Sequence, residues 1–97
     1  MTVIAYVDLV VGAEAAEAAP TVLADFLEGT RSFEGCESVQ VLVGAEDGNR
    51  YRVVATWRDE ASEQVYREWR RGPGRSEEFV ALFAEPPVLS RFQPTDI

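Results

Sequence analysis

Two aromatic side chains that lie nine residues apart, Trp57 and Tyr66, are the residues best suited to chemistry on a flat organic molecule. Trp57 closes a β-rich run, where its indole can either fill the core or form a wall on which an aromatic ligand stacks. The Tyr66 phenol can donate a hydrogen bond to a substrate oxygen that gains negative charge, or it can extend its hydroxyl to solvent. We predict a catalytic role for both.

Asp8 and Arg52 are the second pair of catalytic candidates. By strand alternation both fall on the sheet face turned away from the helices, and the expected topology makes their strands neighbours. They can therefore form a structural ion pair. Alternatively, burial raises the pKa of Asp8 and makes it a general base.

Further aromatic residues are spread along the chain and are predicted to bind the substrate or to fill the core. Sequence spacing does not separate these two roles, although for Trp69 a position in the core is the favoured prediction. The predicted substrate-binding residues are Phe26, Tyr51, Trp69, Phe79 and Phe83. Cys36 has no accompanying base and is interpreted as a small packing residue rather than a nucleophile.

The chain contains no His and no Lys, since all of its basic residues are Arg. This composition excludes a His-based triad, His ligation of zinc or haem, a Schiff-base Lys and a P-loop Lys. A single Cys excludes an internal disulfide and a thiolate metal site. We therefore expect no metal and no cofactor, with proton transfer limited to Asp, Glu, Tyr, Cys, Arg or the substrate.

Chain length, net charge and hydropathy predict the number of domains, the kinds of partner and the location of the protein. Ninety-seven residues predict one domain over 1–97, and the net charge of −8 predicts no binding to nucleic acid. No stretch approaches the roughly 20 apolar residues of a membrane span, and the N-terminus lacks a signal-peptide pattern. We expect a cytoplasmic protein that does not bind membranes.

Alternating and helical patterns then define the elements. Strands are predicted over 2–11, 37–43, 50–57 and 88–92, with a hairpin at 45–49. A helix is predicted over 14–33, where Pro20 requires either a kink or a true start near Ala19. A second helix is capped by Asp59 and carries Ala61, Val65 and Trp69 at i, i+4 spacing. A short third helix is capped by Ser76.

The order β-α-β-β-α-α-β predicts an α+β fold of the ferredoxin-like, split β-α-β type. Its four-stranded antiparallel sheet carries helices on one face only. The opposite face is too apolar to be left in water, because strand alternation places Ile4, Tyr6, Val10, Leu42 and Val54 there. We therefore expect a homodimer formed sheet to sheet.

These features together resemble the antibiotic biosynthesis monooxygenase (ABM) family over nearly the whole chain. The resemblance rests on Gly35-Cys36 after the first helix, the hairpin that ends in Trp57, the acidic helix start at Asp59-Glu60-Ala61 and the apolar third helix. It implies a dimeric α+β barrel. It also implies oxidation of anthrone-like aromatic polyketides by O₂ without metal or flavin, whereas related proteins degrade haem.

The chain departs from the family pattern at three places. Tyr66 stands where members often carry a His, and Val53 stands where the anthrone oxygenases are expected to carry an Asn. The first strand has Tyr6-Val7-Asp8 where the haem-degrading branch carries an Asn. Haem degradation by that route is therefore excluded.

The predicted function is cofactor-independent oxidation of a polycyclic aromatic substrate by O₂ in antibiotic biosynthesis. Electron-rich anthrones can lose a proton and pass an electron to O₂ directly, so that the protein supplies a dry pocket, an oxyanion donor and orientation. One alternative is a cofactor-free cyclase or isomerase, which would turn over without O₂. Another is a non-catalytic small-molecule carrier or auxiliary subunit.

Overall fold

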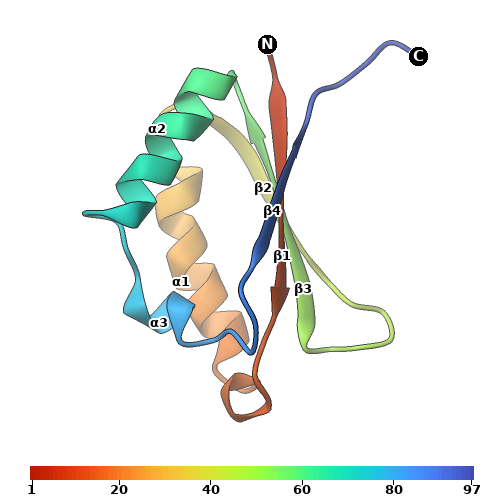
Figure 1. Ribbon diagram of the computed structural model, residues 1–97, viewed down its shortest axis with the longest axis vertical. Helices are drawn as coiled ribbons and strands as arrows, with labels where there is room; N and C mark the ends of the chain where they lie inside the picture. Colours follow the sequence, from red (N-terminus) through yellow and green to blue (C-terminus); the bar gives the residue numbers. More distant parts are fainter.

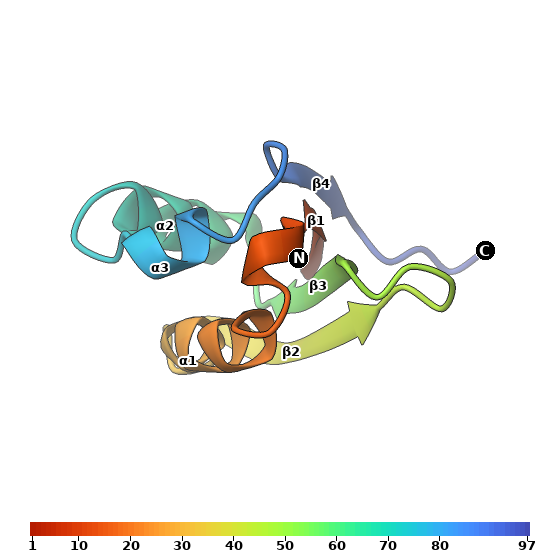
Figure 2. The same ribbon diagram turned by 90° about the horizontal axis from the view of Figure 1, so that it is seen from below.

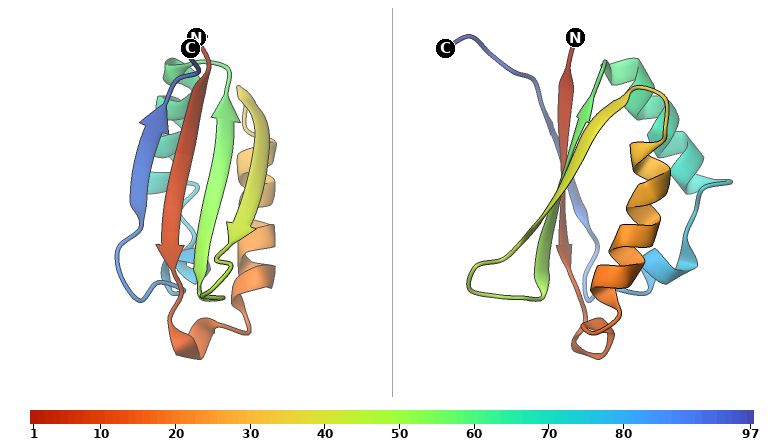
Figure 3. Two further views of the ribbon diagram at one scale, coloured as in Figure 1. Left: turned by 90° about the vertical axis from the view of Figure 1, so that its right-hand side faces the viewer. Right: turned by 180° about the vertical axis from the view of Figure 1, so that it is seen from behind.

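The structure, a computed structural model, describes residues 1–97 and pairs its four strands in the order β2-β3-β1-β4, all antiparallel (Figures 1 and 3). Every helix lies on one side of this sheet, as the view from below shows (Figure 2). The ferredoxin-like α+β fold predicted from the sequence is confirmed. The elements are β1 (Val3–Val10), the 3₁₀ turn η1 (Ala13–Ala15), α1 (Ala19–Arg31), β2 (Cys36–Val43), β3 (Arg50–Trp57), α2 (Glu60–Arg71), α3 (Glu77–Val80) and β4 (Val88–Phe92).

Strand alternation decides which side chains face the helices. In β1 the odd-numbered residues Val3, Ala5 and Leu9 are buried against the helices, and across the sheet they pair with odd-numbered residues of β3. The even-numbered residues face the other way, so the predicted apolar reverse face is present in the structure. No helix covers that face (Figure 3).

Helix α1 begins at Ala19, with Pro20 in its first turn. Proline is tolerated there because the first N–H groups of a helix have no intrahelical acceptor. The preceding residues form a separate 3₁₀ turn rather than a kinked extension of the helix. Of the two possibilities that Pro20 allowed, the start near Ala19 is therefore the correct one.

Helix α2 turns a different face to the sheet from the one its apolar spacing indicated. Asp59 caps it as predicted, since the backbone N–H of Ser62 donates to the Asp59 carboxylate over 2.8 Å, and hydrogen bonding from Ser62 lowers the pKa of Asp59. The buried residues, however, are Glu63 and Tyr66, whereas Val65 is 57% exposed. The row of Ala61, Val65 and Trp69 therefore does not form the inner face of the helix.

The turn before β2 depends on Gly35. This residue has φ +92°, and a Cβ atom there would lie 2.4 Å from the Cβ atom of Ser62 on α2. Only glycine combines that backbone conformation with so close an approach. Gly35 thereby allows the end of α1 and the start of α2 to lie side by side.

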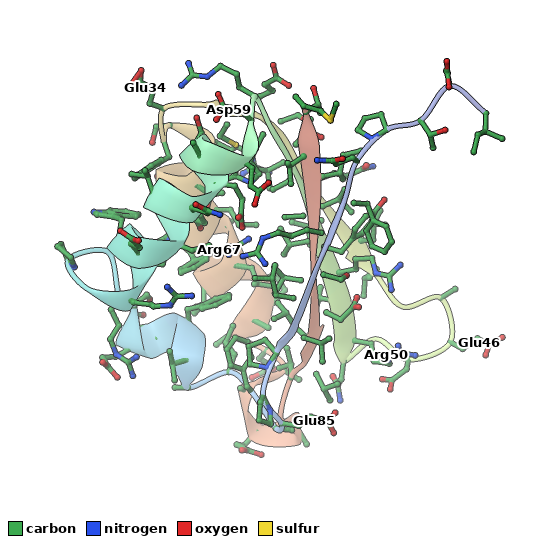
Figure 4. All side chains as sticks on the ribbon, turned by 45° about the horizontal axis from the view of Figure 1, so that its top comes forward. Glu34, Glu46, Arg50, Asp59, Arg67 and Glu85 are labelled. Atoms are coloured by element: carbon green, nitrogen blue, oxygen red, sulfur yellow. The ribbon has the colours of Figure 1, made fainter.

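Glu63 holds α2 to the edge strand β4. Its carboxylate is fully buried and accepts from Arg67 Nε at 2.6 Å and from Arg91 Nε at 2.8 Å. Figure 4 shows Arg67 lying between α2 and the sheet. A buried carboxylate is tolerated only when it is paired in this way.

We expect Glu63→Gln to lower the free energy of unfolding by about 2–3 kcal/mol, because the substitution removes the charge from two charge-assisted hydrogen bonds. Urea unfolding followed by circular dichroism measures this change. Glu68→Gln, on the exposed side of the same helix, is the control and should stay within about 0.5 kcal/mol of the unmodified chain. Equal stability of the two variants would contradict the role given to Glu63.

Candidate functional site

A cavity of about 340 Å³ lies between the inner face of the sheet and the helices. This volume falls at the lower end of the range of small-molecule sites. Most of the lining is apolar and comes from β1, β3, α1, α3 and the segment that leads into β4. The apolar lining residues are Val7, Phe26, Leu27, Val53, Ala55, Phe79, Val80, Phe83, Pro87 and Leu89.

Three phenylalanines form one wall of the cavity. The rings of Phe26 and Phe79 stack with centroids 3.6 Å apart and planes 6° apart, and Phe83 meets Phe79 edge-on at 4.8 Å. The Arg70 guanidinium lies over the other face of this wall, 3.6 Å from the centroid of the Phe26 ring. Both faces of the Phe26 ring are therefore covered, and this wall presents an apolar, aromatic surface to the cavity.

The polar end of the cavity is built by α1 and α2. Tyr66 and Thr30 are each 2% exposed, and their hydroxyl oxygens lie 2.6 Å apart. Arg70 Nε donates to the Tyr66 hydroxyl at 2.8 Å, and Arg70 Nη2 donates to the Thr30 hydroxyl at 3.1 Å. One turn of α2 thus places a phenol and a guanidinium beside a threonine of α1.

The hydroxyl pair keeps one proton for a ligand. Tyr66 and Thr30 carry one hydroxyl proton each, and the hydrogen bond between them uses one of the two. Arg70 can only donate, so it takes up neither proton. The remaining proton can therefore be donated to an oxygen atom bound in the cavity.

Arg70 is the one cationic group of this polar end that lacks a carboxylate partner. Its hydrogen bonds all go to neutral acceptors, namely the two hydroxyls, the Phe26 carbonyl at 2.6 Å and the Gly74 carbonyl at 3.0 Å. These bonds use four of the five N–H groups of a guanidinium, which leaves one on Nη1. Its positive charge is therefore fixed in place and not neutralised by the chain.

Of the predicted site residues, the structure brings Tyr66, Phe26, Phe79 and Phe83 together in the cavity lining. Trp57 is fully buried beneath Tyr66, with ring centroids 4.8 Å apart, and does not line the cavity. Its indole Nε1 has no hydrogen-bond partner. Trp57 thus fixes the position of the Tyr66 ring from below.

Trp69 and Tyr51 also lie outside the cavity lining. Trp69 packs against Phe33 at a centroid distance of 5.3 Å and closely covers Gly74. Tyr51 packs on the core cluster at the far end of β3. Both residues pack on the surrounding core and do not line this cavity.

Asp8 and Arg52 lie on the reverse face of the sheet, away from the cavity. Arg52 donates to the Asp8 carboxylate through Nε at 2.6 Å and through Nη2 at 3.2 Å, so the expected ion pair is present. The Asp8 carboxylate hydrogen bond also raises the pKa of Arg52. Across the sheet from the cavity, Asp8 cannot reach a molecule bound there.

Neither Cys36 nor the acidic residues form a site of another kind. Burial raises the pKa of the Cys36 thiol, which disfavours the reactive thiolate at neutral pH. No group of three or more Cys, Asp or Glu residues is placed to hold a metal ion. None of the helices combines the length and apolar character needed to cross a membrane.

Thr30 and Arg70 line the cavity but were not among the site residues predicted from the sequence. Thr30 did carry a signal, because it is a hydroxyl-bearing residue within the otherwise apolar stripe of the first helix. Arg70 follows Tyr66 by four residues, the spacing that brings two side chains together on a helix. Arg70 also lies in the last turn of α2, where a cation interacts favourably with the helix dipole.

Comparison with known proteins gives a family and a fold. A model of the antibiotic biosynthesis monooxygenase (ABM) family matches residues 1–74. Rv0793 from Mycobacterium tuberculosis superposes with a TM-score of 0.77 at 17% identity, covering 100% of this chain and 98% of that one. A protein from Nitrosomonas europaea, provisionally classed as an antibiotic biosynthesis monooxygenase, gives 0.81 at 15% identity, covering 95% and 97%. No curated protein of known function matches the chain.

Proposed function

The chain belongs to the antibiotic biosynthesis monooxygenase family, and from this premise we propose that it oxidises an electron-rich polycyclic aromatic, an anthrone-like polyketide, with O₂ and without a cofactor. The observation that carries the proposal is the cavity itself. It combines an apolar wall of stacked phenylalanines with a buried hydroxyl pair and a guanidinium at one end. A polycyclic aromatic ring system matches the apolar wall, and its one ionisable oxygen matches the polar end.

The reaction converts a methylene and O₂ into a carbonyl and water. The methylene carbon loses a proton to water, and the resulting enolate transfers one electron to O₂. The carbon radical and superoxide then combine and take up a proton, which gives a hydroperoxide. Loss of the second methylene proton together with hydroxide breaks the O–O bond and leaves the new carbonyl, so that all atoms and electrons of O₂ are accounted for.

The chain contributes to the first step by stabilising the enolate. In a largely apolar cavity, a fixed hydroxyl donor lowers the pKa of the substrate more than it would in water. No carboxylate lines the cavity, so none lies directly against the developing anion. Solvent water, or the substrate itself, accepts the proton.

We expect purified, chelator-treated protein to accelerate O₂ uptake by a model anthrone well above the rate in buffer, with one O₂ consumed for each anthraquinone formed. An oxygen electrode and the absorbance of the quinone provide the two measurements. Product that forms equally fast without O₂ would support the cyclase or isomerase reading instead. Ligand binding without any turnover would support the carrier reading.

The proposal includes a homodimer formed through the reverse face of the sheet. That face exposes large apolar residues, among them Phe92 at 57%, Val88 at 61% and Leu42 at 42%. The strand-paired positions of this face carry a single acidic residue, Asp8, and Arg52 neutralises it. In a chain of net charge −8, two copies therefore repel each other least at this face.

A further inference from the structure

The charged residues that line the cavity are all basic, whereas the chain as a whole carries a net negative charge. Three of the nine basic residues line it, Arg67, Arg70 and Arg75, and none of the 17 acidic residues does. A chain of net charge −8 thus has a cationic border around its most apolar hollow. Such a border attracts anionic ligands and repels cationic ones.

The three arginines are not equally available to a ligand. Arg67 is committed to the buried Glu63 carboxylate at 2.6 Å. Arg75 pairs with Glu77 at 2.7 Å, but the two side chains are 52% and 79% exposed, and an ion pair so exposed is weak and easily exchanged. Arg70 has no carboxylate partner and keeps one N–H group on Nη1. Arg70 and Arg75 are therefore the two cations that a ligand can engage.

Arg70 and Arg75 both lie where the cavity adjoins a second hollow. Both line it, together with Phe26 and Ser76, and the same four residues line a neighbouring hollow of about 280 Å³. Asp25 and Glu78 line that second hollow but not the cavity, so their charges oppose an anion there. An anion is therefore favoured on the cavity side of the two guanidinium groups.

We propose that the substrate carries a carboxylate, bound between Arg70 and Arg75 while the ring system lies in the apolar part of the cavity, between the sheet and α3. This inference rests on the proposed function for the site. It adds that the substrate carries a carboxylate, which aromatic oxidation alone does not require. Arg70 would bind the carboxylate and also donates to the Tyr66 hydroxyl. The position of the carboxylate on the ring system therefore determines which end of the substrate faces Tyr66.

Two probes of the same shape test the proposal, anthracene-2-carboxylate and anthracene-2-carboxamide, with binding followed by the fluorescence of the ring system. We expect the carboxylate to bind about tenfold more tightly, the contribution of one charge-assisted hydrogen bond, and this preference to shrink as salt is added. Arg75→Gln should reduce the preference and Arg70→Gln should abolish it. Arg71→Gln, an exposed neighbour on the same helix, should preserve it.

Equal binding of the two probes would overturn the proposal, and so would failure of both to bind at millimolar concentration. Because Arg70→Gln can disturb the packing of α1 on α2, Arg75→Gln, whose side chain is half exposed, supplies the decisive variant. A preference unchanged by Arg75→Gln would also count against the site. The probes are not oxidised, so these outcomes are independent of the O₂ uptake that tests the proposed function.

Discussion

Tyr66→Phe is expected to slow O₂-dependent turnover of a model anthrone by about a hundredfold, the usual cost of removing one preorganised oxyanion donor. The hydroxyl lies at the polar end of the cavity, 2.6 Å from Thr30 and 2.8 Å from Arg70 Nε. Its loss removes a donor to the enolate but leaves the aromatic ring on Trp57. The effect should therefore appear in kcat more than in KM.

A matched control separates this effect from simple loss of packing. Tyr51→Phe removes the same atom from a tyrosine outside the cavity lining, and we expect its turnover to stay within about twofold of the unmodified chain. Because Tyr66→Phe also leaves Arg70 Nε without its acceptor, thermal unfolding should show a modest loss, of about 1–3 kcal/mol. Turnover by Tyr66→Phe equal to that of Tyr51→Phe would remove the role proposed for the phenol.

The fold could be derived from the sequence because strand alternation and turn residues are local signals. The odd-numbered apolar residues of β1 and β3, the Asp-Gly turn between β2 and β3, and Asp59 before α2 each follow from a few neighbouring residues. Pro20 restricted the first helix to a kink or a start near Ala19, and the structure has the start at Ala19. These signals depend on neighbouring residues and not on the rest of the chain.

The cavity could be derived only in part, because its polar end depends on residues far apart in sequence. Thr30 and Tyr66 are separated by 36 positions, and only the packing of α1 against α2 brings their hydroxyls together. The same holds for Glu63, a carboxylate that is buried only because Arg67 and Arg91 neutralise it. Apolar spacing favoured Val65 as an inner residue of α2, but these polar partners decide how the helix is turned.

The reverse face of the sheet can be tested by placing a carboxylate within it. Val54→Asp is expected to convert a dimer into a monomer, with the dissociation constant rising at least about a thousandfold. Val54 lies in β3 opposite Tyr6, near the middle of the apolar face. A two-fold symmetric interface would contain two such carboxylates, each buried without a partner at a cost of several kcal/mol.

Sedimentation velocity over a range of concentrations gives the association state directly. Val65→Asp is the control, because it introduces the same charge at a residue 57% exposed on α2, on the opposite side of the molecule. That variant should sediment as the unmodified chain does. If the unmodified chain is a monomer at tens of micromolar, or if Val54→Asp remains a dimer, the reverse face does not join two copies. The apolar residues exposed there would then require a different partner, since a patch of this kind is seldom left in water.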